Sequence, residues 1–177
     1  GLCGSCWAFA ATGALECQMK LKTGKLQSLS EQELVDCSRS YGTHGCKRGW
    51  YHKAFDYIIE HGLALESSYP YQAKDGKCIS APRAANCSSY VKIRSGDERL
   101  LQQAVATKGP VSVAVKASLK SFKTYKKGVY YDPKCSPNAP NHAVLIVGYG
   151  KENGADYWLI KNRYTFYKLE NIEMRTS

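Results

Sequence analysis

The sequence predicts an α+β protein built from two lobes, and three observations lead to this fold class. The 177 residues, 44% of them hydrophobic, suffice for one domain or for two small lobes with a substantial core. Residues 1–88 contain helix signals separated by loops that carry cysteines. Residues 89–162 instead contain alternating or continuous apolar runs typical of strands. We therefore expect a mainly helical lobe followed by a β-rich lobe.

Three helices are expected in the helical lobe. The first runs from Cys6 to about Lys22 and is mostly buried, because its small residues permit close packing against another layer. The second begins at Ser30, where the run Ser30-Glu31-Gln32-Glu33 forms a capping box, and it ends at Cys37. The third spans residues 50–61 and ends at a glycine, and residues 69–86 form a loop region.

The β-rich lobe is expected to contain one helix and several strands. The helix covers residues 97–107, with Asp97 as its cap. Alternation over residues 111–115 predicts a half-buried strand, and residues 143–148 form a nearly continuous apolar strand. Further strands are predicted over residues 90–93, 128–131 and 157–161.

The charge balance is basic, with 25 Lys and Arg residues against 15 Asp and Glu residues and a formal net charge of +10. These basic residues are mostly scattered and accompany no nucleic-acid-binding motif. We interpret them as solvated surface and expect no nucleic-acid partner. No apolar run is long enough to cross a membrane, so no membrane association is expected.

Eight cysteines in a chain of this length indicate an oxidising compartment and disulfide bonds. The sequon Asn86-Cys87-Ser88 makes Asn86 a candidate glycosylation site and fits a secretory route. No signal peptide is recognisable at the start of the sequence. We therefore expect that the chain was processed or is incomplete.

The run Cys3-Gly4-Ser5-Cys6-Trp7 carries the first candidate for chemistry. Cys6 is expected in the first turn of a helix, where the helix dipole lowers the pKa of a thiol and favours the nucleophilic thiolate. Half of a zinc site is a poorer interpretation, because no second C-x-x-C and no close histidine pair follows. A redox pair would need a preceding strand. Two structural half-cystines remain an alternative at this stage.

A nucleophilic thiolate needs a base and a third group that orients this base. Among the four histidines, His142 stands directly before the apolar strand, where it could line a cleft or simply cap the strand. Asn162 follows the strand over residues 157–161 and could form a hydrogen bond with the histidine ring.

Taken together, these stretches resemble papain-family cysteine peptidases of the cathepsin L, S and K branch. The resemblance implies a papain-like fold, in which a helical lobe and a β-barrel-like lobe enclose the active-site cleft. The matching stretches, which occur in the family's order, are Cys3 to Phe9, Ser30 to Cys37, Gly109 to Val115, Gly128 to Tyr131, Asn141 to Gly150 and Tyr157 to Asn162.

The resemblance also implies an activity and the residues that perform it. The protein would be a cysteine endopeptidase, with Cys6 as the nucleophile, His142 as the general base and acid, and Asn162 as the group that orients His142. The Cys6 N–H would be one oxyanion donor, and the reaction would pass through an acyl-enzyme. Gly49 would pair with the substrate backbone. The other positions implied to bind substrate are Trp50, Tyr51, Ala117, Pro140, Asn141 and Ala143.

Disulfides, partners and location follow from the same resemblance. It implies the disulfides Cys3–Cys46 and Cys37–Cys78. It implies protein and peptide substrates, cystatin-like inhibitors, the protein's own propeptide, a monomeric state, and a lysosomal or secreted location. It implies no metal and no organic cofactor.

Three departures from the family pattern qualify the resemblance. The family's segment before Gly1, with a glutamine that supplies the second oxyanion donor, is missing, and losing such a donor costs about 10²–10³ in rate. Arg48 replaces a glycine in the substrate-binding loop. Residues 163–177 lack the family's Ser-Trp-Gly continuation, and we interpret them as a non-family tail. Our hypothesis is that this tail is translated from an intron. The alternative function is a catalytically inactive, truncated homologue that at most binds peptides or inhibitors.

Overall fold

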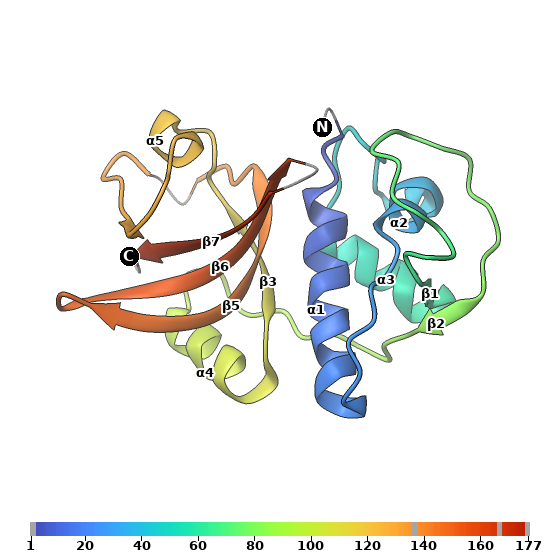
Figure 1. Cartoon of the computed structure of the whole chain (residues 1–177), viewed down its shortest axis with the longest axis horizontal. Coiled ribbons are helices and arrows are strands. Elements are labelled where there is room, and N and C mark those ends of the chain that lie inside the picture. Colours follow the sequence, from blue (N-terminus) through green and yellow to red (C-terminus); the bar gives the residue numbers. More distant parts are fainter. Residues whose placement is uncertain (1–2, 136–137, 166–167, 176–177) are drawn as a thin grey trace. The chain divides into compact units, whose positions relative to one another are not determined.

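The computed structural model describes residues 3–135, 138–165 and 168–175. It divides into two compact units, Gly1–Lys92 and Ile93–Ser177 (Figure 1). The first unit contains α1 (Cys6–Thr23), α2 (Glu31–Cys37), the 3₁₀ helix η1 (Arg39–Tyr41), α3 (Tyr51–His61), β1 (Leu63–Ala64) and β2 (Arg83–Ala85). The second contains α4 (Glu98–Lys108), β3 (Val111–Val115), α5 (Lys120–Lys123), β4 (Val129–Tyr130), β5 (His142–Glu152), β6 (Ala155–Thr165) and β7 (Lys168–Arg175). Helices in one unit and an extended sheet in the other confirm the α+β class.

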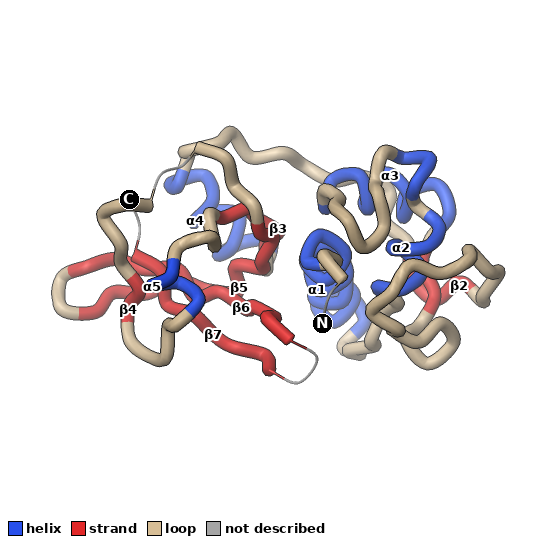
Figure 2. Tube along the Cα trace, turned by 90° about the horizontal axis from the view of Figure 1, so that it is seen from above, coloured by secondary structure: helices blue, strands red, loops and turns tan. Residues whose placement is uncertain are grey.

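The helix α1 is the longest helix of the first unit and packs against α2 and α3 (Figure 2). Its buried face consists largely of small residues, including Ala8, Ala11 and Gly13, which let the neighbouring helices approach closely. The helix ends at Gly24, whose φ of 74° places it in the left-handed conformation favoured at helix C-termini. The predicted first helix is thus confirmed at both ends.

The helix α2 begins with half of the predicted capping box. The Ser30 hydroxyl accepts a hydrogen bond from the Glu33 N–H at 3.0 Å. The Glu33 carboxylate does not reciprocate, because it accepts hydrogen bonds from the Tyr57 hydroxyl and the Ala64 N–H, both at 2.8 Å. The Ser30 N–H instead donates to the Ala64 carbonyl at 3.0 Å. Ala64, which follows α3, therefore provides hydrogen-bond partners for the Ser30 N–H and the Glu33 carboxylate, the two groups that a complete capping box would have paired with each other.

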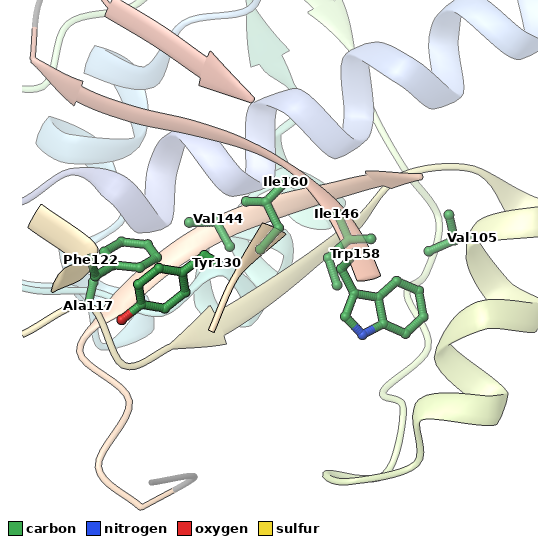
Figure 3. Packing of buried hydrophobic residues seen from close by; sticks show 8 residues of the cluster. All are labelled: Val105, Ala117, Phe122, Tyr130, Val144, Ile146, Trp158 and Ile160. Atoms are coloured by element: carbon green, nitrogen blue, oxygen red, sulfur yellow. The ribbon is translucent and has the colours of Figure 1, made fainter. Parts of the chain in front are cut away.

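The second unit is built on a five-stranded sheet with the order β3-β5-β6-β7-β4. All neighbouring strands are antiparallel except the β4–β7 pair. Val144 and Ile146 on β5 stand two positions apart, as do Trp158 and Ile160 on β6, so their side chains share one face of the sheet. Figure 3 shows this core, which comprises Val105, Ala117, Phe122, Tyr130, Val144, Ile146, Trp158 and Ile160.

Several strand predictions need correction. The predicted strand over residues 90–93 is wrong, since this segment has no strand pairing and Val91 is 89% exposed. The hydroxyl of Tyr90 donates to Asp56 at 2.9 Å, so this aromatic residue is anchored by α3 instead of a sheet. Strands β5 and β6 extend beyond the predicted ranges to a two-residue turn at Asn153-Gly154, where both residues have positive φ.

The predicted tail over residues 163–177 forms part of the sheet. The strand β6 continues to Thr165, and β7 pairs antiparallel with it, with Arg163 opposite Leu169. Residues 166–167 and 176–177 of this tail lie outside the described residues. Among the helices of the described part of the chain, none is long and apolar enough to cross a membrane.

Candidate active site

Cys6 is the first residue of α1 and is half-buried, and its thiol belongs to neither disulfide. The N–H groups of Ala8 and Phe9 in the first turn donate to the Ser5 carbonyl at 2.9 and 3.2 Å. The first turn of α1 contains no acidic side chain, so no carboxylate of this turn offsets the positive end of the helix dipole. Cys6 therefore stands where the dipole of α1 is favourable to a negative charge.

The residue before Cys6 is held by a contact that the sequence did not reveal. The buried Ser5 side chain forms a hydrogen bond of 2.5 Å with the Tyr71 hydroxyl. The Tyr71 ring also packs edge-on against Phe9, with ring centroids 5.0 Å apart. Tyr71 thus fixes the start of α1 from a loop about 66 residues away in sequence. Only a tertiary contact brings this loop to α1, so no local signal could have indicated it.

The loop around Cys46 is tied to the segment that carries Cys6. A disulfide joins Cys3 to Cys46, and the Gly4 N–H donates to the Cys46 carbonyl at 2.8 Å. Further along, the Trp7 indole N–H donates to the Gly45 carbonyl at 3.4 Å. The structure therefore fixes this loop beside the beginning of α1 by a covalent bond and two hydrogen bonds.

Gly49 closes this loop against the indole ring of Trp7. A Cβ atom at Gly49 would lie 2.4 Å from Cδ2 and Cε2 of that ring, far inside van der Waals contact. Trp50, the next residue, is 48% exposed and precedes α3, and Tyr51 is half-buried at its first position. Burial raises the pKa of the Tyr51 hydroxyl above its usual value.

In the second unit, the structure brings His142 and Asn162 together. The Nε2 atom of His142, at the start of β5, lies 2.7 Å from the Oδ1 atom of Asn162 on β6. Because a carbonyl oxygen only accepts, Nε2 carries the proton of this bond and Nδ1 is left for other chemistry. Asn162 is 2% exposed, so the bond is shielded from water on the asparagine side.

Strand register explains this contact. Leu145 on β5 pairs with Lys161 on β6, so Asn162 stands one position further toward His142. Side chains at such diagonal positions of an antiparallel pair can reach one another across about 7–8 Å. Within the described residues, the buried Nδ2 atom of Asn162 has no hydrogen-bond partner.

The remaining predicted substrate positions of this unit surround Asn141. Its side-chain oxygen accepts a hydrogen bond from the Ala117 N–H at 2.8 Å, and its own N–H donates to the Val115 carbonyl at 3.0 Å. Ala117 is buried, Pro140 is exposed and Ala143 pairs with Ala114 across β3 and β5. Asn141 therefore fixes the chain immediately before His142, a role that the sequence alone did not reveal.

The other predicted sites, a second disulfide and a glycosylation position, belong to the first unit. The second disulfide joins Cys37 to Cys78, and both disulfides are the pairings that the resemblance implied. Asn86 is exposed directly after β2 and lines a pocket of about 370 Å³ together with Glu60, His61 and Arg83. The described residues contain no group of three His, Cys, Asp or Glu side chains that could hold a metal ion.

Comparisons with known proteins agree with this picture. The family described as "Papain family cysteine protease" matches residues 1–168 and so extends past Asn162 into the predicted tail. Cathepsin S of Bos taurus is 58% identical over 168 residues, which cover 93% of this chain and 50% of that protein. Digestive cysteine proteinase 2 of Homarus americanus is 56% identical over 167 residues, which cover 93% of this chain and 52% of that protein.

A solved structure supports the fold. The digestive procathepsin L 3 of the Tenebrio molitor larval midgut superimposes with a TM-score of 0.91 at 44% identity, over 98% of this chain and 57% of that one. The papain-like fold expected from the sequence is thereby confirmed. The chain spans about half the length of the curated relatives that it matches.

Proposed function

The chain belongs to the papain family of cysteine proteases, and from this premise we propose that the protein is an endopeptidase that uses Cys6, His142 and Asn162. Cys6 is the nucleophile, His142 transfers protons, and Asn162 orients the His142 ring. The observation that carries this assignment is the 2.7 Å hydrogen bond between His142 Nε2 and Asn162 Oδ1, which fixes the tautomer of the base. High identity to cathepsins favours this function over the alternative of an inactive homologue.

The proposed reaction has two halves. The Cys6 thiolate attacks the scissile carbonyl, and the Cys6 N–H at the start of α1 donates to the oxygen that becomes negative. The C–N bond then breaks, the leaving amine takes a proton from the His142 imidazolium, and a thioester remains on Cys6. In the second half, His142 takes a proton from water, whose oxygen attacks the thioester. The carboxylic acid leaves, and the Cys6 thiolate and the His142 imidazolium are restored.

Substrate binding is proposed at positions on both units. Gly49 pairs with the backbone of an extended peptide, which its close packing on Trp7 supports because no side chain projects from this position. A pocket for the second residue before the cut is assigned to Trp50, Tyr51, Ala117, Pro140 and Ala143, with Asn141 as the residue that holds this segment. Its hydrogen bond to the Ala117 N–H supports this role for Asn141.

The proposed biological setting follows the family. Proteins and peptides are the substrates, and no nucleic acid, membrane or organic cofactor takes part. A propeptide, suggested by the procathepsin relative, and cystatin-like proteins are the proposed inhibitors. We assign the protein to lysosomes or the extracellular space as a monomer with a glycan on Asn86, whose exposure in a loop supports modification.

Active-site labelling tests this function. The protein expressed from its complete gene is treated with an epoxide that alkylates reactive thiols, and the labelled peptide is identified by mass spectrometry. We expect the unlabelled protein to cleave peptides. We expect the epoxide to label Cys6, and this labelling to abolish the cleavage. Cys6→Ser and His142→Ala should each lower kcat/KM by at least about 10⁴. The matched control is Cys135→Ser, since Cys135 is exposed and forms no disulfide within the described residues. Labelling confined to Cys135, or no cleavage by the unmodified protein, would refute the proposal.

A further inference from the structure

The loop beside Cys6 carries two adjacent basic side chains, Lys47 and Arg48. Both are exposed. The Lys47 N–H donates to the His44 carbonyl at 3.1 Å, and the Arg48 carbonyl accepts from the His44 N–H at 2.8 Å. These two bonds fold the loop into a compact turn. The Cys3–Cys46 disulfide joins this turn to the segment that carries Cys6. After the turn, Gly49 packs against the Trp7 ring.

No acidic side chain neutralises this pair within the described residues, since neither Lys47 nor Arg48 forms an ion pair there. The acid that contacts this loop, Asp75, is already engaged. The Oδ1 atom of Asp75 accepts from the Arg39 guanidinium at 2.6 Å and from the Cys46 N–H at 2.9 Å. The Nη2 atom of Arg48 lies 3.4 Å from Nε2 of His44, which adds no negative charge. The loop therefore presents a net positive charge next to the segment of Cys6.

We propose that Lys47 and Arg48 select peptide substrates with an acidic side chain at the third residue before the cleaved bond. This inference rests on the proposed function, in which Gly49 pairs with the substrate backbone and Trp50 and Tyr51 contact the second residue before the cut. In this proposal the amino end of the extended peptide runs toward Lys47 and Arg48, which directly precede Gly49, so the two cations border the third residue before the cut. A carboxylate there meets two cations that lack an acidic partner.

The size and salt dependence of this preference follow from the exposure of both side chains. An ion pair in solvent contributes little, so the gain in kcat/KM for Glu over Gln is about threefold to fivefold at low salt. At about 1 M salt the Debye length is about 3 Å, so the preference should nearly vanish. A preference for Glu that came from shape or hydrogen bonding alone would persist in salt.

The test compares two peptides that differ only in Glu or Gln at the third residue before the cut. The protein expressed from its complete gene should cleave the Glu peptide about threefold to fivefold more efficiently at low salt. Arg48→Gln should lower this ratio, Lys47→Gln together with Arg48→Gln should bring it close to one, and Lys47→Glu together with Arg48→Glu should invert it. The matched control is Arg99→Gln, which removes the same charge from an exposed position on α4. A ratio near one in the unmodified protein, or an equal loss in Arg99→Gln, would overturn the inference.

Two measurements separate this inference from the proposed function. Labelling of Cys6 in each variant shows that the nucleophile and the fold around it are intact. Cleavage of both peptides without discrimination overturns only the role of Lys47 and Arg48. Failure to cleave either peptide overturns the proposed function together with the inference.

Discussion

The His142 and Asn162 side chains meet through a 2.7 Å hydrogen bond between Nε2 and Oδ1, on adjacent strands of the same sheet. The bond protonates Nε2, so Nδ1 is the ring nitrogen that can exchange a proton with a thiol or a leaving group. Asn162 is nearly inaccessible to water, and rigid strands carry both residues. The ring orientation is therefore determined by the sheet, before any substrate binds.

Asn162→Ala should lower kcat by about 10², because an imidazole without its acceptor can rotate away from a productive geometry. Asn162→Asp retains an acceptor and adds a negative charge that favours the charged imidazolium, so the upper limb of the pH–rate profile should move to higher pH. Kinetics of peptide cleavage over a pH series check both results. Gln102→Ala, which removes an exposed amide from α4, serves as the control. An unchanged kcat in Asn162→Ala would remove the positioning role.

Gly49→Ala should lower the free energy of unfolding by about 1–3 kcal/mol, because its Cβ would overlap the Trp7 ring and force the loop or the indole to shift. Urea titration of the complete protein measures this change. The control is Gly148→Ala, where the closest side-chain atom to a new Cβ is 3.7 Å away, an ordinary contact. Equal stability of the two variants would mean that Trp7 adjusts without cost.

Local signals predicted those elements whose ends are determined by their own residues. The strand over residues 111–115 is found with the predicted bounds. The Asp97 side chain caps α4 by accepting from the Leu100 N–H at 2.9 Å. The predicted end of the third helix before Gly62 is likewise found, with a φ of 70° at that glycine. Caps and alternation act within a few residues, so they can be read without knowing the tertiary contacts.

Elements that depend on distant partners were not predictable in this way. The strands β1 and β2 are only two and three residues long and pair with each other across a long loop. The strand β7 depends on its pairing with β6 and β4. Asn153-Gly154, by contrast, was a readable turn signal that would have extended the predicted strands toward it.

The candidate site was predictable to a similar degree. Cys6 and His142 stand at the ends of regular elements, where sequence patterns are clear. The role of Asn141 in holding the Ala117 N–H requires knowledge of the β3–β5 register, which no local pattern supplies.

Glu31, on α2, is a buried carboxyl whose charge is unfavourable. Burial is the main cause that raises its pKa from 4.5 to about 7, and the charges of Glu66 and Glu16 add to it. A hydrogen bond of 2.8 Å from the Thr12 hydroxyl opposes the shift. Between these two pH values the folded protein holds a proton that the unfolded chain releases. The contribution of protonated Glu31 to the free energy of unfolding is therefore fully present below about pH 4.5 and is lost as the pH rises through about 7.

Glu31→Gln should remove this pH dependence, because the amide keeps an acceptor for Thr12 and cannot ionise. At about pH 8 the variant should exceed the unmodified protein by roughly 3 kcal/mol in free energy of unfolding, and at about pH 4.5 the two should agree. Urea titrations at both pH values measure the difference. Glu152→Gln, at an exposed position, should leave the pH dependence unchanged. The same pH slope in Glu31→Gln would show that another group causes it.

Glu33→Gln should be far more damaging than Arg83→Gln, although the two side chains form one ion pair. Glu33 is completely buried, and its carboxylate accepts hydrogen bonds from the Tyr57 hydroxyl, the Ala64 N–H and the Arg83 guanidinium. In Glu33→Gln one carboxylate oxygen becomes an amide NH₂ group, which then faces a donor instead of accepting from it. Each buried donor left without an acceptor costs about 1–3 kcal/mol, so the loss across this network should reach about 3–5 kcal/mol. Arg83 has 41% of its side chain exposed, Glu33 keeps its two other donors without it, and the new amide can still donate to Glu33, so Arg83→Gln should cost only about 1–2 kcal/mol. Urea titration of both variants measures the asymmetry. Equal losses would mean that the ion pair, and not the buried hydrogen bonds from Tyr57 and Ala64, determines the contribution of Glu33 to stability.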